Sequence, residues 1–203
     1  IDLHKLFKNG FFFFFLYLRT PNSIGSYSAL AAIAIQANQN EQHGGQSIPA
    51  FDFYMAPGVL KTFKKEYKQA LYELLDFTDF ISFVNMDKVA QTIDKLNSIT
   101  VDIGIFENFY KESKEVRKIF EKAYDTALAR TDRATYQAME AFVHNLNTMH
   151  SRAGAQVPFS SINYGTDTSP EGRLVMESVM LATEAGLGNG ETPIFPIQIF
   201  KVK

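Results

Sequence analysis

The sequence predicts an α/β fold in which helix predominates. Apolar residues recur at helical spacing in two long segments, Val59–Asp76 and Glu107–His150. Between Gln156 and Val202, two strand-like segments flank a helix with clear start and stop signals. A strand, a helix and a second strand in this order are typical of a βαβ unit, which places two parallel strands in one sheet.

The first twenty residues predict a short helix followed by an extended segment. Asp2–Lys8 has the pattern of a helical turn, and Asn9-Gly10 closes it. The Phe11–Leu18 segment, FFFFFLYL, is apolar throughout, which favours a buried strand. A signal peptide is the alternative, but Arg19-Thr20-Pro21-Asn22 follows where a small-residue cleavage site would stand.

The next segment predicts two helices separated by a loop. Either residue of Asn22-Ser23 can cap a helix that runs to about Asn38. The polar residues of Asn38–Ser47 cannot form a packed core, so they are interpreted as a loop. Pro57-Gly58 is expected to interrupt the chain, which places the following helix at Val59–Asp76.

Two further helical regions follow. Asn85 is predicted to cap a short helix. The Glu107–His150 segment is long for one helix of a globular protein, and Thr131-Asp132 can both end one helix and start another. We therefore predict two helices in this segment.

The C-terminal βαβ unit carries the clearest signals. Gln156–Asn163 is predicted to be its first strand. Ser169-Pro170-Glu171 supplies an N-cap, a proline at the first helical position and an acid at the positive end of the helix. Gly186 ends this helix, and Ile194–Val202 is predicted to be the second strand.

The composition excludes several classes of function. The chain has 20 basic and 22 acidic residues, and this balance provides no excess of positive charge of the kind that binds nucleic acid. No stretch reaches the roughly 18 apolar residues that a membrane helix needs. Cysteine is absent, which excludes a disulfide, a thiolate metal site and a cysteine nucleophile within these residues. Because the chain starts at Ile1 without Met and stops within a strand-like run, we expect it to be an internal fragment.

Two sets of residues suggest chemistry that their context does not support. The Gly186-x-Gly188-x-Gly190 loop follows a helix, whereas a dinucleotide fingerprint follows a strand and opens a helix. A helix stop and a tight turn are therefore the favoured interpretation. The histidines include no pair at the i, i+4 spacing of a helical metal site, so we predict no metal, although His43 in its glycine turn could contact a ligand. They are His4, His43, His144 and His150.

Polar side chains interrupt the Gln156–Asn163 strand. Consecutive Ser160 and Ser161 must point to opposite faces of a sheet, whereas a strand buried on both faces is normally apolar throughout. Polar residues here favour a strand end that meets a ligand, as at the C-terminal ends of strands in α/β barrels. The alternative is that nearby backbone groups satisfy these side chains.

Four segments form a specific set of motifs that spans nearly the whole chain. They are Pro21-Asn22-Ser23-Ile24, Gln42-His43-Gly44-Gly45-Gln46-Ser47, Arg152–Asp167 (RAGAQVPFSSINYGTD) and Gly186–Pro196 (GLGNGETPIFP). Together, and in this order, they resemble the anaerobic (class III) ribonucleoside-triphosphate reductases. The Phe12–Tyr17 segment departs from the pattern, because the family carries glycine and small polar residues there.

The resemblance implies a partial ten-stranded α/β barrel of the glycyl radical enzyme type, with residues 1–203 as an internal fragment of one catalytic domain. It implies reduction of ribonucleoside triphosphates to deoxyribonucleoside triphosphates with a glycyl radical and formate, under ATP and deoxynucleotide effectors. It also implies a cytoplasmic homodimer, activated by an iron–sulfur adenosylmethionine protein, with no nucleic-acid or membrane partner.

The family's radical glycine, its reactive cysteines and its N-terminal ATP-binding domain would all lie outside these residues. We therefore expect this segment to hold no catalytic residue, to bind no cofactor and to be inactive alone. A glycyl radical enzyme of the formate-lyase type is the nearest alternative. A non-enzymatic helical interaction module is the other, supported only by the Glu107–His150 stretch.

The same resemblance implies two sets of binding residues. Residues facing the substrate would be Gln46, Ser47, Ser160, Ser161 and Asn163. Residues binding the effector nucleotide at the dimer interface would be Asn22, Gly25, Gln36 and Lys68. Lys68 belongs to a basic helix face whose simplest interpretation is solvation, although an ammonium group is a compact partner for phosphate.

Overall fold

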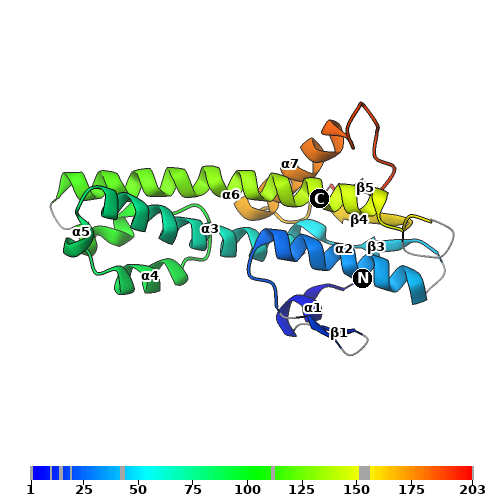
Figure 1. Ribbon diagram of the computed structural model, residues 1–203, viewed down its shortest axis with the longest axis horizontal. Helices are drawn as coiled ribbons and strands as arrows, with labels where there is room; N and C mark the ends of the chain where they lie inside the picture. The colour runs from blue at the N-terminus through cyan, green and yellow to red at the C-terminus, as the bar shows by residue number, and fades with distance from the viewer. Residues whose placement is uncertain are drawn as a thin grey trace. The chain divides into compact units, whose positions relative to one another are not determined.

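The computed structural model describes residues 2–9, 11–13, 16–18, 20–41, 44–110, 113–150 and 156–202. These residues form a mixed, helix-rich α/β structure with a small parallel sheet (Figure 1). The elements follow in the order α1 (His4–Asn9), β1 (Phe11–Phe13), β2 (Leu16–Leu18), α2 (Ile24–Glu41), β3 (Gln46–Ile48), α3 (Phe51–Phe77), the 3-10 helix η1 (Ile81–Phe83), α4 (Met86–Asp94), the 3-10 helix η2 (Ile103–Phe106), α5 (Glu107–Tyr110), α6 (Lys114–Thr148), β4 (Ser160–Tyr164), α7 (Pro170–Ala185) and β5 (Ile197–Phe200).

The chain divides into two compact units. The first unit, which we call unit 1, comprises Ile1–Val59 and Ala134–Lys203, and unit 2 comprises Leu60–Arg133. The long helices α3 and α6 each contribute residues to both units. All the described strands belong to unit 1, so the predicted binding face of the sheet has to be sought there.

The sheet of unit 1 has three parallel strands in the order β3-β4-β5. Gln46 of β3 lies opposite Ser160 of β4, and Ser161 lies opposite Ile197 of β5. The predicted βαβ unit is confirmed, because β4, α7 and β5 follow one another and the two strands pair in parallel. Strand β5 is shorter than predicted, since Pro196 has no N–H group to donate to a neighbouring strand.

Helices α2 and α7 pack on the same face of this sheet. Asn38 of α2 donates a hydrogen bond to the side chain of Gln46 on β3. Gln198 of β5 donates to the hydroxyl of Thr183 on α7 at 2.5 Å. Gln46 and Gln198 both occupy the face that also buries Ile162, so the two helices cover one side of the sheet.

The opposite face of the sheet remains open. Ile197 and Ile199 of β5 are 57% and 44% exposed, and Ser47 of β3 is also exposed. By contrast, Ile48 and Ile162 on the covered face are fully buried. The sheet therefore has one face in the core and one face available to a ligand or to further chain.

Close packing joins α2 to the first turns of α3. A Cβ atom on Gly58 would lie 2.8 Å from Cγ of Tyr27 and 3.2 Å from Cα of Ile24. We expect Gly58→Ala to lower the free energy of unfolding by about 1–3 kcal/mol, because a backbone atom has to move to make room. Urea denaturation followed by circular dichroism measures this loss.

Gly25→Ala is the matched control for that substitution. Gly25 lies on an exposed part of α2, and the nearest atom to an added Cβ is 4.0 Å away. Alanine there should be neutral or stabilising by up to about 1 kcal/mol, because it favours helix more than glycine does. Equal losses from both variants would show that close packing is not the cause.

The core of unit 2 is a cluster of aromatic rings. The Phe106 ring centroid lies 5.7 Å from that of Tyr67 and 5.3 Å from that of Phe120, and all three residues are fully buried. The Tyr67 hydroxyl donates to the backbone oxygen of Phe120 at 3.4 Å. Burial raises the pKa of Tyr67 far above its usual value, so this hydroxyl stays protonated.

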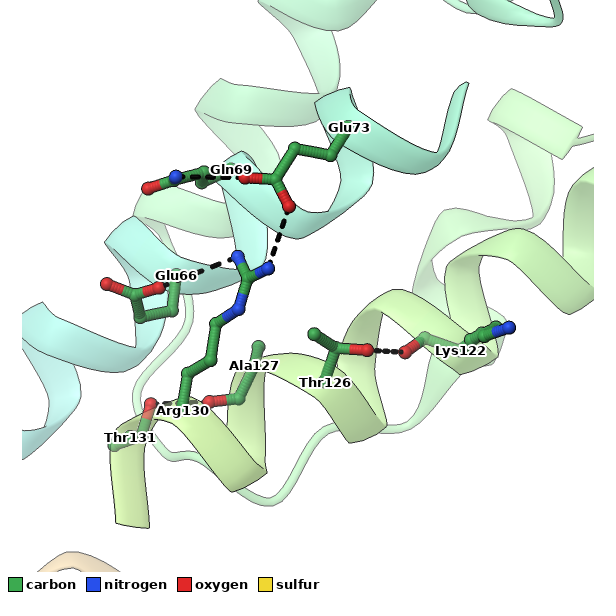
Figure 2. Close-up of polar contacts among 8 residues, drawn as sticks. All are labelled: Glu66, Gln69, Glu73, Lys122, Thr126, Ala127, Arg130 and Thr131. Atoms are coloured by element: carbon green, nitrogen blue, oxygen red, sulfur yellow. Dashed lines mark hydrogen bonds and ion pairs between the residues drawn. The ribbon is translucent and has the colours of Figure 1, made fainter. Parts of the chain in front are cut away.

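An arginine on α6 joins two acids on α3 within unit 2. Figure 2 shows Arg130 between Glu66 and Glu73, with nitrogen–oxygen distances of 3.8 and 2.8 Å. Hydrogen bonds from Arg130 and then from Gln69 lower the pKa of Glu73 below its usual value of 4.5. This ionised carboxylate therefore stabilises the fold above pH 4.5, and the contribution is lost as pH falls through the lowered pKa.

We expect Arg130→Gln to raise the pKa of Glu73 towards its usual value. The rise should be partial, because Gln69 still donates to Glu73 at 2.9 Å. A carboxyl-carbon NMR titration of Glu73 measures the change directly. Arg117→Gln, which removes an exposed i, i+4 pair with Glu121, is the control and should leave Glu73 unchanged. An unchanged pKa of Glu73 in the Arg130→Gln variant would show that Arg130 is not the group that lowers this pKa.

Both predicted interruptions of the long helices are wrong. Helix α3 continues through Pro57, whose ring is exposed, while Met55 and Val59 on either side are fully buried. Their burial outweighs the single hydrogen bond that proline removes. Helix α6 continues through Thr131, because the Thr131 hydroxyl donates to the Ala127 oxygen at 2.7 Å and is satisfied inside the helix (Figure 2).

Two other boundaries differ from the prediction. The Phe11–Leu18 segment contains an antiparallel pair of short strands, β1 and β2, and not one strand, because the segment can satisfy backbone hydrogen bonds within itself. Its central Phe14-Phe15 lies outside the described residues. The Asn38–Ser47 segment is only partly a loop, since α2 continues to Glu41 and Gln46 begins β3.

Candidate functional site

Three predicted substrate residues share the open face of the sheet. Ser47 lies opposite Ser161 in the β3–β4 pair, and Asn163 is two residues further along β4. The Ser47 hydroxyl lies 3.5 Å from the amide oxygen of Asn163, at the upper limit of a hydrogen bond. Ile197 and Ile199 continue the same face on β5. Hydroxyl and amide groups beside an apolar surface suit a ligand with both polar and apolar parts.

The other two predicted substrate residues lie on the covered face. Gln46 is 5% exposed and Ser160 is 3% exposed. The Gln46 side chain accepts a hydrogen bond from Asn38, whereas the Ser160 hydroxyl has no hydrogen-bond partner among the residues described. Consecutive Ser160 and Ser161 thus point to opposite faces, as strand geometry requires. Substrate binding by all five residues stays a prediction.

The C-terminal ends of the three strands meet at one edge, where Asp52 holds the turn that follows β4. Asp52 lies in the first turn of α3 and is fully buried. Its Oδ2 atom accepts three backbone N–H bonds, from Gly165 at 2.8 Å, Thr166 at 3.1 Å and Asp167 at 3.0 Å. Hydrogen bonds to a charged group each contribute about 1.5–3 kcal/mol, so this cluster fixes the turn strongly.

Lys201 provides a second link across this edge. Its backbone N–H donates to the Tyr164 oxygen at 2.8 Å, and its Nζ donates to the Pro49 oxygen at 3.0 Å. The residue after β5 is therefore attached both to the end of β4 and to the turn after β3. Asp52 and Lys201 together tie the three strand ends to one another.

The start of α7 next to this edge is capped as predicted. The Ser169 hydroxyl accepts from the Gly172 N–H at 3.0 Å, and Pro170 is the first helical residue. Asp167 adds a further bond by accepting from the Ser169 N–H at 2.9 Å. At the other end, Gly186 stops the helix with φ of 76°, which confirms the interpretation of the glycine loop as a helix stop.

Asn147 of α6 holds the segment that leads into β5. Its Oδ1 accepts from the N–H groups of Ile194 at 2.8 Å and Phe195 at 3.0 Å, and its Nδ2 donates to the Phe195 oxygen at 2.5 Å. The side chain thus pairs with the backbone as a neighbouring strand would. It fixes part of the Gly186–Pro196 motif beside the sheet.

Sequence reasoning missed both Asp52 and Asn147. An acid in the first turn of a helix is ordinary, because it complements the helix dipole, so nothing local marks Asp52. Its partners lie more than a hundred positions away in the chain. Asn147 lies near the C-terminal end of α6, where polar residues are also common, and only the fold brings Ile194 and Phe195 to it.

The predicted effector residues do not form one cluster within a single unit. Asn22 and Gly25 lie together at the exposed start of α2, and Gln36 lies further along the same helix. Lys68 belongs to unit 2, where its Nζ forms an ion pair with Asp94 at 2.6 Å. Neighbouring Lys64 also donates to the Asp94 backbone oxygen, at 2.8 Å. Effector binding by these residues remains a prediction.

Some predicted features fall outside the described residues. Gln42-His43, with the proposed ligand contact of His43, and the Arg152–Ala155 part of the third motif are among them. Within the described ranges, no three His, Cys, Asp or Glu side chains lie together so that they could hold a metal ion. No helix in the same ranges combines the length and the apolar character needed to cross a membrane.

Comparisons with known proteins give one consistent result. A family model described as anaerobic ribonucleoside-triphosphate reductase matches residues 1–203. The enzyme of this name from Enterobacteria phage T4 is 27% identical over 97% of this chain and 25% of its own length. The one from Escherichia coli K12 is 26% identical over 100% of this chain and 22% of its own length. The chain thus spans about a quarter of these relatives.

Proposed function

The chain belongs to the anaerobic ribonucleoside-triphosphate reductase family, and from this premise we propose that it is part of the catalytic barrel of an enzyme that reduces ribonucleoside triphosphates to deoxyribonucleoside triphosphates. The family match over residues 1–203 carries the proposal. The open polar face of the parallel sheet supports it, because ligands bind at the C-terminal ends of strands in α/β barrels. The reaction uses a glycyl radical with formate as reductant. The glycine that stores the radical and the cysteine that becomes the thiyl radical belong to other parts of the full-length protein.

In this proposal, the ribonucleotide lies against the open face of the sheet. Ser47, Ser161 and Asn163 contact it, since hydroxyl and amide groups can both donate to and accept from ribose hydroxyls. Gln46 and Ser160 belong to the same two strands, β3 and β4, but their side chains lie on the covered face.

We further propose that a deoxynucleoside triphosphate effector binds at a homodimer interface through Asn22, Gly25, Gln36 and Lys68. Phosphate has to replace Asp94 as the partner of Lys68. Lys68→Ala in the full-length dimer should therefore weaken effector binding about tenfold or more, the loss expected for a charge-assisted bond. Lys65→Ala, an exposed lysine on the same helix, is the control and should bind the effector normally in equilibrium dialysis.

The reaction itself can be tested with full-length protein under anaerobic conditions. The protein is activated by an iron–sulfur adenosylmethionine protein and supplied with a ribonucleoside triphosphate and formate. The proposal predicts formate-dependent formation of the deoxyribonucleotide. Formate turnover without any nucleotide would favour an enzyme of the formate-lyase type. Failure to bind any deoxynucleoside triphosphate would favour a helical interaction module.

A further inference from the structure

Asp52 is the residue that connects the ends of the two strands carrying the proposed substrate contacts. It follows the last residue of β3, Ile48, by four positions and sits in the first turn of α3. Its carboxylate reaches the turn Gly165–Asp167, which begins directly after β4. Ser47 and Asn163 stand just before these two strand ends, on the open face.

The turn presents the three N–H groups as a site for an anion. Successive backbone N–H groups that point to one place form a concave anion-binding nest. One oxygen of the buried Asp52 carboxylate occupies this nest, at 2.8–3.1 Å from the three nitrogens. Charge-assisted bonds of this kind are roughly twice as strong as neutral ones, so the conformation of the turn depends on the carboxylate.

The neighbouring helix does not depend on Asp52 in the same way. The first turn of α7 is capped by the Ser169 hydroxyl, which accepts from the Gly172 N–H at 3.0 Å, and Asp52 holds neither of these two residues. Losing the carboxylate should therefore loosen the turn and the end of β4 while the cap of α7 remains. The residue most affected on the open face is Asn163, two positions before Gly165.

We propose that Asp52 is a positioning residue for the ribonucleotide site, whose buried carboxylate fixes the Gly165–Asp167 turn and thereby the orientation of Asn163 beside Ser47. This role rests on the proposed function, because the site that Asp52 positions is the proposed ribonucleotide site. Asp52 does not touch the substrate in this scheme, because it is fully buried beneath the strand ends.

The first test compares Asp52→Asn and Asp52→Ala in the activated full-length enzyme. Asparagine keeps one oxygen acceptor but no charge, whereas alanine removes every acceptor from the nest. We expect KM for the ribonucleotide to rise about tenfold in the asparagine variant and further in the alanine variant, with a smaller change in kcat. Asp87→Asn, an exposed acid in the first turn of α4, is the matched control and should leave both constants unchanged.

The split between KM and kcat separates positioning from general destabilisation. A loss of folded enzyme lowers the apparent kcat and leaves KM as it was, because the remaining molecules bind normally. Lower kcat with unchanged KM in the asparagine variant would therefore overturn the proposal.

A second measurement does not depend on activity. Hydrogen exchange of the Gly165, Thr166 and Asp167 amides should be slowest in the wild type, faster in Asp52→Asn and fastest in Asp52→Ala. Unchanged exchange in the variants would overturn the role of Asp52 even if the enzyme reduces nucleotides. Wild-type protein that shows this protection but forms no deoxyribonucleotide would count against the proposed function alone.

Discussion

Phe120→Ala is expected to lower the free energy of unfolding by about 3–5 kcal/mol, the range for removing a large aromatic side chain from a core. Phe120 is fully buried in unit 2, and its ring centroid lies 5.3 Å from that of Phe106 and 5.9 Å from that of Tyr110. These rings meet at tilted and edge-on angles and are packed against other aromatic side chains, so they cannot all move inward and a cavity should remain. Urea denaturation followed by circular dichroism at 222 nm measures the loss.

Phe77→Ala is the matched control for Phe120→Ala. Phe77 is the last residue of α3 and is 87% exposed, so the same atoms are removed with little burial lost. The expected change is within about 0.5 kcal/mol. A Phe120 variant no less stable than the Phe77 variant would show that the aromatic cluster does not form the core of unit 2.

Gly165→Ala is expected to cost about 2–5 kcal/mol, because two separate effects add. Gly165 has φ of 106°, a left-handed conformation that costs other residues about 1–2 kcal/mol. Its Cβ would also lie 2.5 Å from the Lys201 backbone oxygen and 2.9 Å from the Phe200 ring, and overpacking adds about 1–3 kcal/mol. The turn held by Asp52 and the end of β5 would both have to shift, which denaturation and amide exchange should detect.

Gly188→Ala separates the two effects. Gly188 has nearly the same conformation, with φ of 111°, but an added Cβ would meet nothing within 4 Å. Only the conformational cost of about 1–2 kcal/mol is then expected. Equal losses from the two variants would mean that close approach to Lys201 and Phe200 contributes nothing at Gly165.

The sequence correctly predicted those helices whose first and last turns are capped by residues close to them in the chain. Asn85 caps α4 by accepting from the Lys88 N–H at 3.1 Å, and Ser169 and Gly186 bound α7 as expected. The βαβ order followed from the same signals. These features depend on groups within a few positions of one another, so a single sequence contains the necessary information.

Other features depend on contacts that are distant in sequence, and there the prediction was wrong or incomplete. A proline at position 57 normally ends a helix, but the fully buried Met55 and Val59 keep α3 continuous. The division of the polar strand residues between an open and a covered face became clear only from the pairing of β3 with β4. The proposed substrate and reaction rest on the family resemblance, because helix and strand periodicity carry no information about chemistry.

The pairing of β3 with β4 also sets the order in which the chain can fold. Gln46 pairs with Ser160, 114 positions later, so this contact closes a very long loop. The segment between them includes unit 2, whose helices α3 and α6 already approach one another where Arg130 meets Glu66. Contacts between residues closer in sequence form faster than more distant ones, so the α3–α6 contacts of unit 2 should form before the β3–β4 pairing and shorten the loop that remains. The parallel strands that carry the proposed substrate residues should then be the last to assemble in refolding experiments.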